Sequence, residues 1–240
     1  MVVLGIAEPH RSAKYELAIC VAGITIHGYF RRIYSIPMRY FYYHPFRKYQ
    51  YIRYDLIGRG NDTRPESMRV DMSSIEPGDD ASPSTIYQLI RENVSPSFEY
   101  LQSRRERSLG IVEPWRVDSC IAEENDNPRT GKFTMARGEE RRMSLLPFWM
   151  RIDFLCRPRC KSHHTMCEDM ELGNHFRRLR LQMGSRSEAT DRVADETNEF
   201  LADSNPLFLV GTHIRWKTWL IISVINRQAE HLYSLSHLTD

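Results

Sequence analysis

Strand-forming residues fill the first 60 positions and limit what the amino-terminal part of the chain can fold into. β-Branched and aromatic side chains favour a pleated, half-buried backbone. His27 and Gly28 supply a turn signal between two of the strand-like stretches. Several strands joined by short turns predict a small barrel or curled sheet. The stretches are residues 2–7, 17–26, 29–36 and 49–57.

Polar and helical signals divide the rest of the chain. A polar connection around Pro77 leads into apolar residues at helical spacing. Further strands follow, with two helix starts that have capping-box spacing, Thr165 with Glu168 and Ser185 with Glu188. We therefore expect an α+β fold in four parts: a small β-barrel over 1–75, a helical linker region over 76–107, a second β-rich half with two to four helices over 108–226, and a flexible tail over 227–240.

Composition and cysteine usage favour an intracellular protein that folds by itself. With 240 residues and 41% hydrophobic content, the chain can bury a large core without disulfides. Its five cysteines are odd in number and the first 20 residues lack a secretory signal, which predicts a cytoplasmic location. The longest apolar runs fall far short of the roughly 18 residues of a membrane span, so we expect no membrane contact.

Aromatic and basic side chains interleave over residues 29–54, and no acidic residue occurs between Glu16 and Asp55. Single-stranded nucleic acid binds such surfaces, because cations neutralise phosphates and aromatic faces stack bases at about 1–3 kcal/mol each. The alternative is that strand alternation turns half of the rings into the core and leaves the arginines as an ordinary wet face. The candidates for nucleic-acid contact are Arg31, Arg32, Tyr34, Arg39, Tyr42, Arg47, Lys48 and Tyr49.

A second candidate surface is the connection over residues 211–218, between the last two expected strands. Loops that join strands often carry binding groups. This one offers both cations and a ring, although a polar connection with a half-buried Trp would have the same sequence. Its candidate contacts are His213, Arg215, Trp216 and Lys217.

Cysteine and histidine gather between a strand and a capped helix in the order C-x3-C-x2-H-H-x2-C. Zinc takes four such ligands in a tetrahedron, so the cluster predicts a zinc site. The alternative is that the cysteines pack as small apolar groups and a histidine hydrogen-bonds near the helix start. The predicted metal ligands are Cys156, Cys160, His163 and Cys167.

Seven segments follow one another along the chain: CVAGI (20–24), RIYSIP (32–37), FRKYQ (46–50), DTRPES (62–67), SLGIVEP (108–114), CKSH (160–163) and FLVGTH (208–213). In this order they resemble a family of uncharacterised prokaryotic proteins. The amino-terminal part also resembles, more distantly, the dual-OB-containing domain, which implies OB-like barrels and nucleic-acid association, including in anti-phage or other conflict systems. The sequence departs from the family pattern at Met170, where Trp is expected, and it lacks an aromatic-proline ending. The resemblance implies functional roles for Arg64, Glu66, Cys160, His163, Asp169, Glu171 and His213.

Three functions remain open at this point. The chain contains no Gly-x-Ser-x-Gly, phosphate-cradling Gly-rich loop or His-Glu-x-x-His motif, so a binding protein for single-stranded DNA or RNA is our leading hypothesis, with Arg64 among the contacts. A protein-interaction scaffold is one alternative. The other is a metal-dependent hydrolase or nuclease that uses His163, His164, Asp169 and His213.

Overall fold

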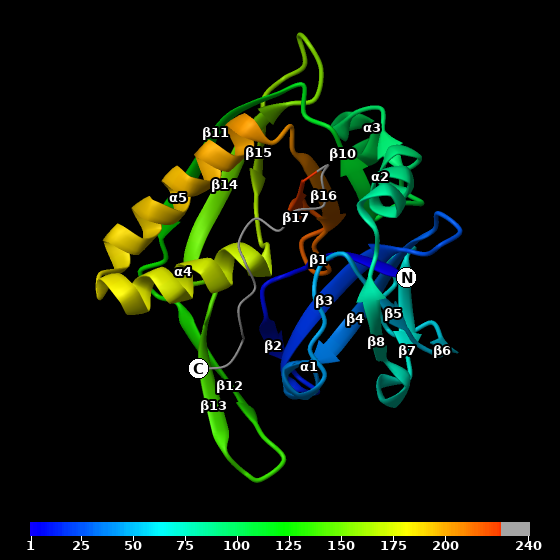
Figure 1. Ribbon diagram of the computed structural model, residues 1–240, viewed down its shortest axis with the longest axis vertical. Coiled ribbons are helices and arrows are strands. Elements are labelled where there is room, and N and C mark those ends of the chain that lie inside the picture. The colour runs from blue at the N-terminus through cyan, green and yellow to red at the C-terminus, as the bar shows by residue number, and fades with distance from the viewer. Residues whose placement is uncertain (227–240) are drawn as a thin grey trace.

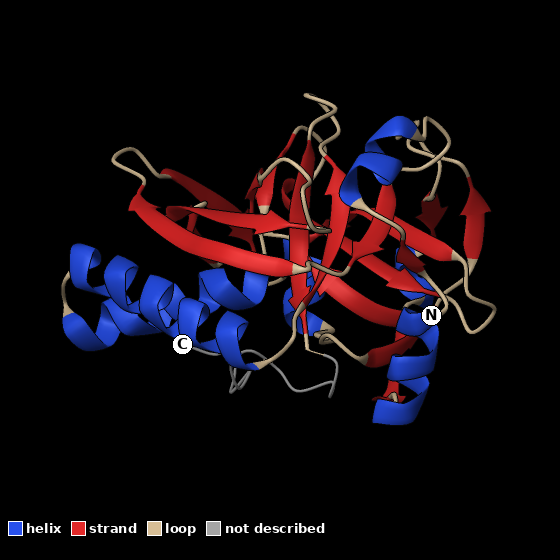
Figure 2. Cartoon of the chain, turned by 90° about the horizontal axis from the view of Figure 1, so that it is seen from above, coloured by secondary structure: helices blue, strands red, loops and turns tan. Residues whose placement is uncertain are grey.

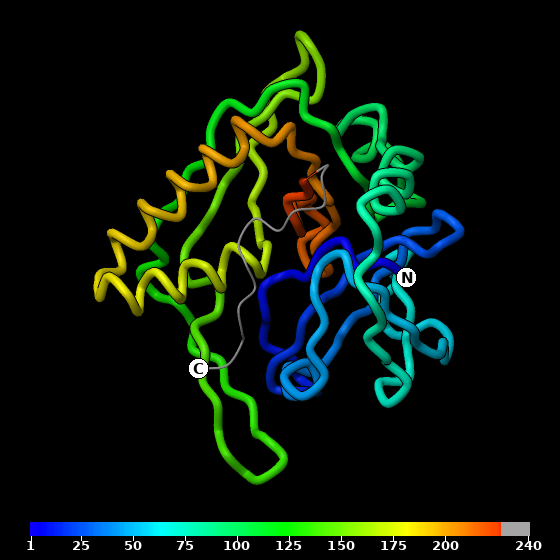
Figure 3. The backbone as a smooth tube through the Cα atoms, in the orientation of Figure 1, coloured from blue at the N-terminus to red at the C-terminus, as the bar shows by residue number. Residues whose placement is uncertain are grey.

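The computed structural model describes residues 1–226, and the predicted tail over 227–240 lies outside them. These residues form an α+β fold, as expected, with a curled half-barrel sheet on one side and a layer of strands and helices on the other (Figure 1). Figure 3 shows the chain leaving the curled sheet through the teal and green segments at the right of the view and entering the second half at the top. Among residues 1–226, no helix has both the length and the apolar character that crossing a bilayer requires.

The amino-terminal sheet has eight strands, seven of them in the order β6-β7-β4-β3-β1-β5-β8, with β2 paired to β3. Its pairs are antiparallel except β4 with β7. A short helix, α1 (Met38–Tyr43), lies within the aromatic and basic run, between two of the predicted strand stretches. The strands are β1 (Val2–Ile6), β2 (His10–Ser12), β3 (Glu16–Ile24), β4 (Phe30–Pro37), β5 (Gln50–Arg53), β6 (Leu56–Gly58), β7 (Ser67–Val70) and β8 (Glu76–Asp80).

The second half contains a four-stranded sheet in the order β17-β16-β10-β9, a three-stranded sheet in the order β11-β14-β15, and a hairpin. The hairpin, β12 with β13, projects from the body of the protein (Figure 1). The strands are β9 (Val94–Ser95), β10 (Leu109–Val112), β11 (Arg116–Glu124), β12 (Arg129–Thr134), β13 (Glu140–Leu145), β14 (Phe148–Leu155), β15 (His163–Met166), β16 (Leu207–Thr212) and β17 (Trp219–Ile225).

Four helices accompany this half: α2 (Pro83–Arg91), α3 (Phe98–Ser103), α4 (Met170–Met183) and α5 (Arg186–Asp203). Figure 2 shows α4 and α5 side by side against one face of the strands. The predicted cap of α5 is confirmed, because the Ser185 side chain accepts from the backbone N–H of Glu188. The cap predicted at Thr165 is wrong: Thr165 belongs to β15, and Asp169 caps α4 by accepting from the N–H of Glu171.

Strand β3 is buried on both faces, which explains why it lacks polar alternation. Cys20, Ala22 and Ile24 pack in a cluster with β10, β16 and β17 of the second half. Ile19 and Val21 pack in another cluster with α1 and the β12–β13 hairpin. A strand covered on both sides reads as a continuous apolar run. The two halves therefore share one core layer.

A buried ionic network joins the halves. The Lys48 ammonium donates to the Glu171 carboxylate and to the Val224 carbonyl oxygen at 3.0 Å, and it lies 3.8 Å from Asp169. Asp169 in turn accepts from the Ser223 hydroxyl at 2.8 Å. Burial opposes the charge of Lys48, but the two carboxylates outweigh it and raise the pKa of Lys48 above its usual value. Lys48 therefore stays charged and links the sheet to α4 and β17.

Close backbone approach accompanies this network. A side chain at Gly5 would place its Cβ 2.7 Å from the Cβ of Ser223, so only glycine lets β1 lie this near β17. Two buried arginines cross the same boundary. Arg32 donates to the Ser108 carbonyl oxygen at 2.7 Å, and Arg64 donates to the Thr212 carbonyl oxygen at 2.7 Å.

Replacing Lys48 with methionine should cost about 3–5 kcal/mol of unfolding free energy, because Glu171 and Asp169 would lose their buried counter-charge. Equilibrium urea unfolding measures the loss. The control is Arg47→Ala, since the Arg47–Asp80 ion pair is half exposed and such pairs contribute about 0–1 kcal/mol. A Lys48→Met variant as stable as this control would show that the network does not hold the halves together.

Glu168 gives the boundary a pH dependence. Burial, followed by the charge of Glu8, raises the pKa of Glu168 from 4.5 to about 7. The folded protein therefore favours the protonated carboxyl, and stability falls as pH rises from about 4.5 through 7. The unfolding free energy of Glu168→Gln should exceed that of the natural chain by about 1–3 kcal/mol at pH 8 and by little at pH 4.5. The control, Glu199→Gln at an exposed position, should show no such pH-dependent gain. Equal stabilisation by Glu168→Gln at both pH values would contradict this account.

Candidate metal centre

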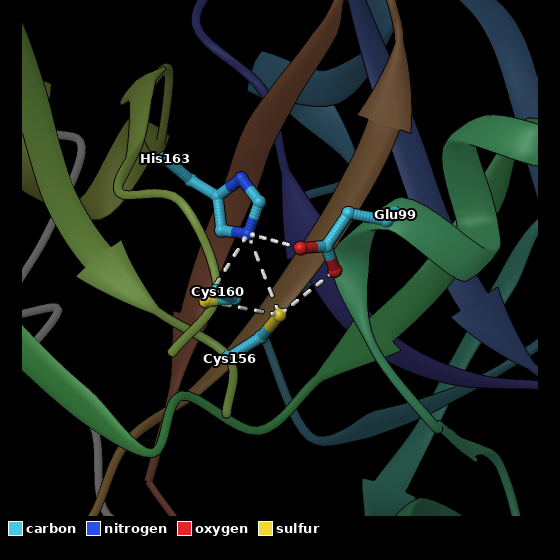
Figure 4. A group of neighbouring side chains, drawn as sticks. All are labelled: Glu99, Cys156, Cys160 and His163. Carbon is cyan, nitrogen blue, oxygen red and sulfur yellow. Dashed lines mark hydrogen bonds and ion pairs between the residues drawn. The ribbon is translucent and has the colours of Figure 1, made fainter. Parts of the chain in front are cut away.

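The turn that follows β14 brings together three of the four predicted metal ligands. Cys156 and Cys160 lie in this turn, which is closed by the Cys160 N–H donating to the Arg157 carbonyl oxygen at 3.2 Å. His163 opens β15 and pairs with Phe154 of β14. Antiparallel pairing therefore returns the imidazole to the end of the strand from which the cysteines depart, where the three side chains converge (Figure 4).

A fourth group, Glu99, comes from the first turn of α3. Its neighbour Phe98 packs edge-on against the His163 ring at 5.0 Å and lies 5.7 Å from the Phe154 ring. This aromatic packing points the Glu99 carboxylate at the side chains of Cys156 and His163 (Figure 4). One oxygen lies 3.1 Å from the Cys156 sulfur and the other lies 3.5 Å from Nε2 of His163.

The spacing of these atoms suits a single tetrahedral ion. The two sulfurs lie 3.9 Å apart, and Nε2 of His163 lies 3.4 Å from the Cys156 sulfur and 3.9 Å from the Cys160 sulfur. Zinc bonds of about 2.3 Å to sulfur and about 2.0–2.1 Å to nitrogen would separate tetrahedral ligands by about 3.4–3.8 Å. All four ligand atoms lie within 4.8 Å of one another. The group can therefore hold one metal ion.

Burial sets the charge state of the ligands. It raises the pKa of the Cys156 thiol to about 11 and lowers the pKa of His163. Burial would also raise the pKa of Glu99, but the hydrogen bond from Cys156 and other donors lower it overall. Without a cation the thiol keeps its proton, whereas a bound metal ion displaces it, so metal binding releases protons.

The structure replaces one predicted ligand by another residue. Cys167 lies four residues beyond His163, about 13 Å along an extended strand, and its backbone bridges to Ile221. Glu99 takes the fourth position. Because 57 residues separate Glu99 from Cys156, no spacing pattern points to it. The adjacent His164 faces away from the centre and pairs with Asp153 at 2.9 Å.

The aromatic and basic candidates of the amino-terminal half are distributed between core and surface. Among them, Arg39 and Arg47 are exposed, and Arg47 pairs with Asp80. The half-buried residues are Arg31, Tyr34 and Tyr42. The buried residues are Arg32, Lys48, Tyr49 and Arg64, which in this structure face the protein interior.

Most of the candidate nucleic-acid contacts in the β16–β17 loop are exposed to solvent. Arg215, Trp216 and Lys217 are exposed, and His213 is half buried. The structure does not bring the proposed hydrolase residues together, because His163 lies in the metal centre while the others have separate partners. Asp169 accepts from Ser223, as described above. Glu66, the remaining residue suggested by the resemblance, accepts from the Ser108 N–H at 3.0 Å.

Two family models together span nearly the whole chain. Residues 1–95 match the domain of unknown function DUF8758, and residues 96–237 match the domain of unknown function DUF8757. A search of curated proteins found no match. All four residues of the metal centre fall within the second matched region.

One zinc ion per chain should bind at this centre, and Cys160→Ser should abolish stoichiometric binding. Cys167→Ser is the matched control and should retain the ion, because Cys167 lies outside the group. Elemental analysis measures the content, and removal of the ion by a chelator should lower the melting temperature by on the order of 5–10 °C. Loss of zinc in Cys167→Ser but not in Glu99→Ala would favour the ligand set that the sequence predicts.

Proposed function

The chain belongs to the DUF8757 family, and we propose that it binds single-stranded nucleic acid through a loop that zinc holds in place. Two thiolates, an imidazole and a carboxylate form a ligand set that suits zinc. Four protein ligands also leave no open position for water or substrate. The ion then has a structural role, and the exposed residues around it make the contacts.

The loop between the ligands is strongly basic. Arg157, Arg159 and Lys161 are all exposed, and they lie between Cys156 and His163. Cations at such spacing neutralise successive phosphates and release the counterions condensed on them. A metal ion that fixes both ends of the loop reduces the entropy lost when these side chains meet a strand.

A second basic segment follows the helix that carries Glu99. Arg104, Arg105 and Arg107 follow α3 directly, and all three are exposed. Arg104 is paired with Glu106, which leaves the other two without a salt bridge among residues 1–226. Glu99 lies in the first turn of α3, so a single short helix connects this segment to the metal centre.

Aromatic rings beside the centre favour an unpaired strand over a duplex. The Trp115 ring is 55% exposed, and its backbone N–H donates to the Leu155 carbonyl oxygen at 2.7 Å, next to Cys156. The Arg116 guanidinium lies 5.5 Å from the centre of this ring. Exposed rings stack unpaired bases, and a neighbouring arginine holds the phosphate.

The resemblance of the amino-terminal half to the dual-OB-containing domain supports the same function. A curled sheet of OB type would add a second contact surface, with exposed Arg39 and half-buried Arg31 and Tyr42 as its available residues. The resemblance also supports a role in a prokaryotic conflict system. The observation that carries the proposal is the four-residue geometry of the metal centre, since it explains why a basic loop is held rigid.

Replacing Arg157, Arg159 and Lys161 together with alanine should weaken binding of a single-stranded oligonucleotide and flatten its salt dependence. Each lost phosphate contact should reduce the slope of log affinity against log salt by about 0.7. Fluorescence anisotropy between about 50 and 200 mM salt measures both effects. The control variant replaces Lys132, Arg137 and Arg142, three exposed cations of the β12–β13 hairpin region.

Two outcomes would overturn the proposal. Equal slopes for the two triple variants would mean that the metal loop does not contact phosphate. The absence of any salt-sensitive affinity in the unmodified protein would favour a protein-interaction scaffold instead. Cleavage of the oligonucleotide that depends on zinc would indicate a catalytic rather than a structural ion.

A further inference from the structure

A second group of polar and aromatic side chains gathers away from the metal centre, where the curled sheet meets the β16–β17 loop. His10 comes from β2, Tyr34 from β4 and Arg64 from the segment before β7. His213 begins the loop that follows β16. The group thus combines the region that matches one family model with the region that matches the other.

Three of these side chains form a stack. The His10 and Tyr34 rings are stacked with centroids 5.3 Å apart, and Nε2 of His10 lies 3.1 Å from the Tyr34 hydroxyl. The Arg64 guanidinium lies 5.1 Å from the centre of the Tyr34 ring. Arg64 also donates to the carbonyl oxygen of Thr212 at 2.7 Å, so the stack is tied to the residue that precedes His213.

His213 presents a free donor beside this stack. Its Nδ1 accepts from the backbone N–H groups of Arg215 at 3.1 Å and Trp216 at 3.2 Å. A nitrogen that accepts two such bonds carries no proton, which places the imidazole proton on Nε2. Within residues 1–226, Nε2 of His213 has no hydrogen-bond partner.

Backbone hydrogen bonds close this loop, and it carries an exposed ring. The His213 N–H donates to the Thr218 carbonyl oxygen at 2.8 Å, and the Lys217 N–H donates back to the His213 carbonyl oxygen at 3.1 Å. These bonds hold the Trp216 ring, which is 53% exposed, with the Arg215 guanidinium 4.8 Å from its centre. A platform ordered in advance loses little entropy on binding.

Cations lie near both histidines of this junction, and one of them, Arg64, is paired with Asp62 at 2.7 Å. Burial comes first among the causes that lower the pKa of His10 to about 4, and the charges of His213 and Arg64 follow. Burial also lowers the pKa of His213, and Arg64 and Arg215 add to it. Arg215 and Lys217 are exposed in this loop and form no salt bridge within residues 1–226, so their charges are available to an anion.

We propose that this junction binds the phosphate group of a nucleotide, with the Nε2–H of His213 and the Arg215 guanidinium as contacts and the Trp216 ring as the platform for the base. The nucleotide is either free or the end of a strand. The strand-end form rests on the proposed function, whereas the free form does not. Arg64 and Tyr34 act as positioning residues, because they orient the loop and its donor.

The test measures binding of inorganic phosphate, of a nucleoside and its 5′-monophosphate, and of a single strand with and without a terminal phosphate. Imidazole ¹H–¹⁵N spectra should show the His213 resonance moving with inorganic phosphate. Hydrogen bonds to charged groups are stronger than neutral ones, so the phosphorylated strand or the monophosphate should bind about 10-fold or more tightly than its unphosphorylated counterpart.

Two variants carry the test. His213→Asn keeps an acceptor for the two backbone N–H groups but removes the Nε2 donor. Arg215→Gln should leave folding intact, because the Arg215 side chain is exposed. Both should lose the preference for the phosphorylated probe. The matched controls, His27→Gln in the β3–β4 turn and Arg137→Gln near the hairpin tip, should keep it, because both residues are exposed elsewhere.

An unmoved His213 resonance at saturating inorganic phosphate, or equal phosphate preference in Arg215→Gln and the natural chain, would overturn the proposal. A preference only for the monophosphate would identify a free nucleotide as the ligand, and a preference only for the strand would identify its end. Failure of the metal-loop variant to change strand affinity, with phosphate binding retained, would count against the proposed function alone.

Discussion

One buried ammonium group, that of Lys48, sets the relation between the two halves of this protein. A charge in the interior is tolerated only where opposite charges and carbonyl oxygens surround it. Here the partners come from α4 and β17, so the amino-terminal sheet satisfies its lysine only when the second half lies against it. Strand β3 also needs the second half, because the second half covers one of its apolar faces and keeps it from water.

The two candidate sites depend on this arrangement to different degrees. The metal centre is assembled within the second half, through the packing of Phe98 on Phe154 and His163, and needs no contribution from the curled sheet. The junction of His10, Tyr34 and Arg64 with the β16–β17 loop exists only when the halves are in register. A change that separates the halves should therefore disturb the junction before it disturbs the metal centre.

Local sequence patterns predicted much of the fold and only part of the sites. Strands β1, β3 and β4 follow from β-branched and aromatic runs, and the cap of α5 follows from its Ser185 and Glu188 spacing. The run at 38–43 contains the same residue types but forms α1, where its packing on the sheet outweighs β propensity. Burial of Lys48 could not be predicted from the local sequence. Its carboxylate partner Glu171 lies 123 residues further along the chain, and the residues next to Lys48 would look the same if its side chain were exposed. Glu99 was missed for the same reason.

The metal centre offers a single ion two sulfurs, one imidazole and one carboxylate. X-ray absorption at the zinc edge tests it most directly, on the full chain loaded with one equivalent of zinc. The account predicts two sulfur neighbours at about 2.3 Å and two nitrogen or oxygen neighbours at about 2.0–2.2 Å, with one oxygen neighbour lost or replaced in Glu99→Ala. Three sulfur neighbours, or a shell without sulfur, would contradict the centre described above.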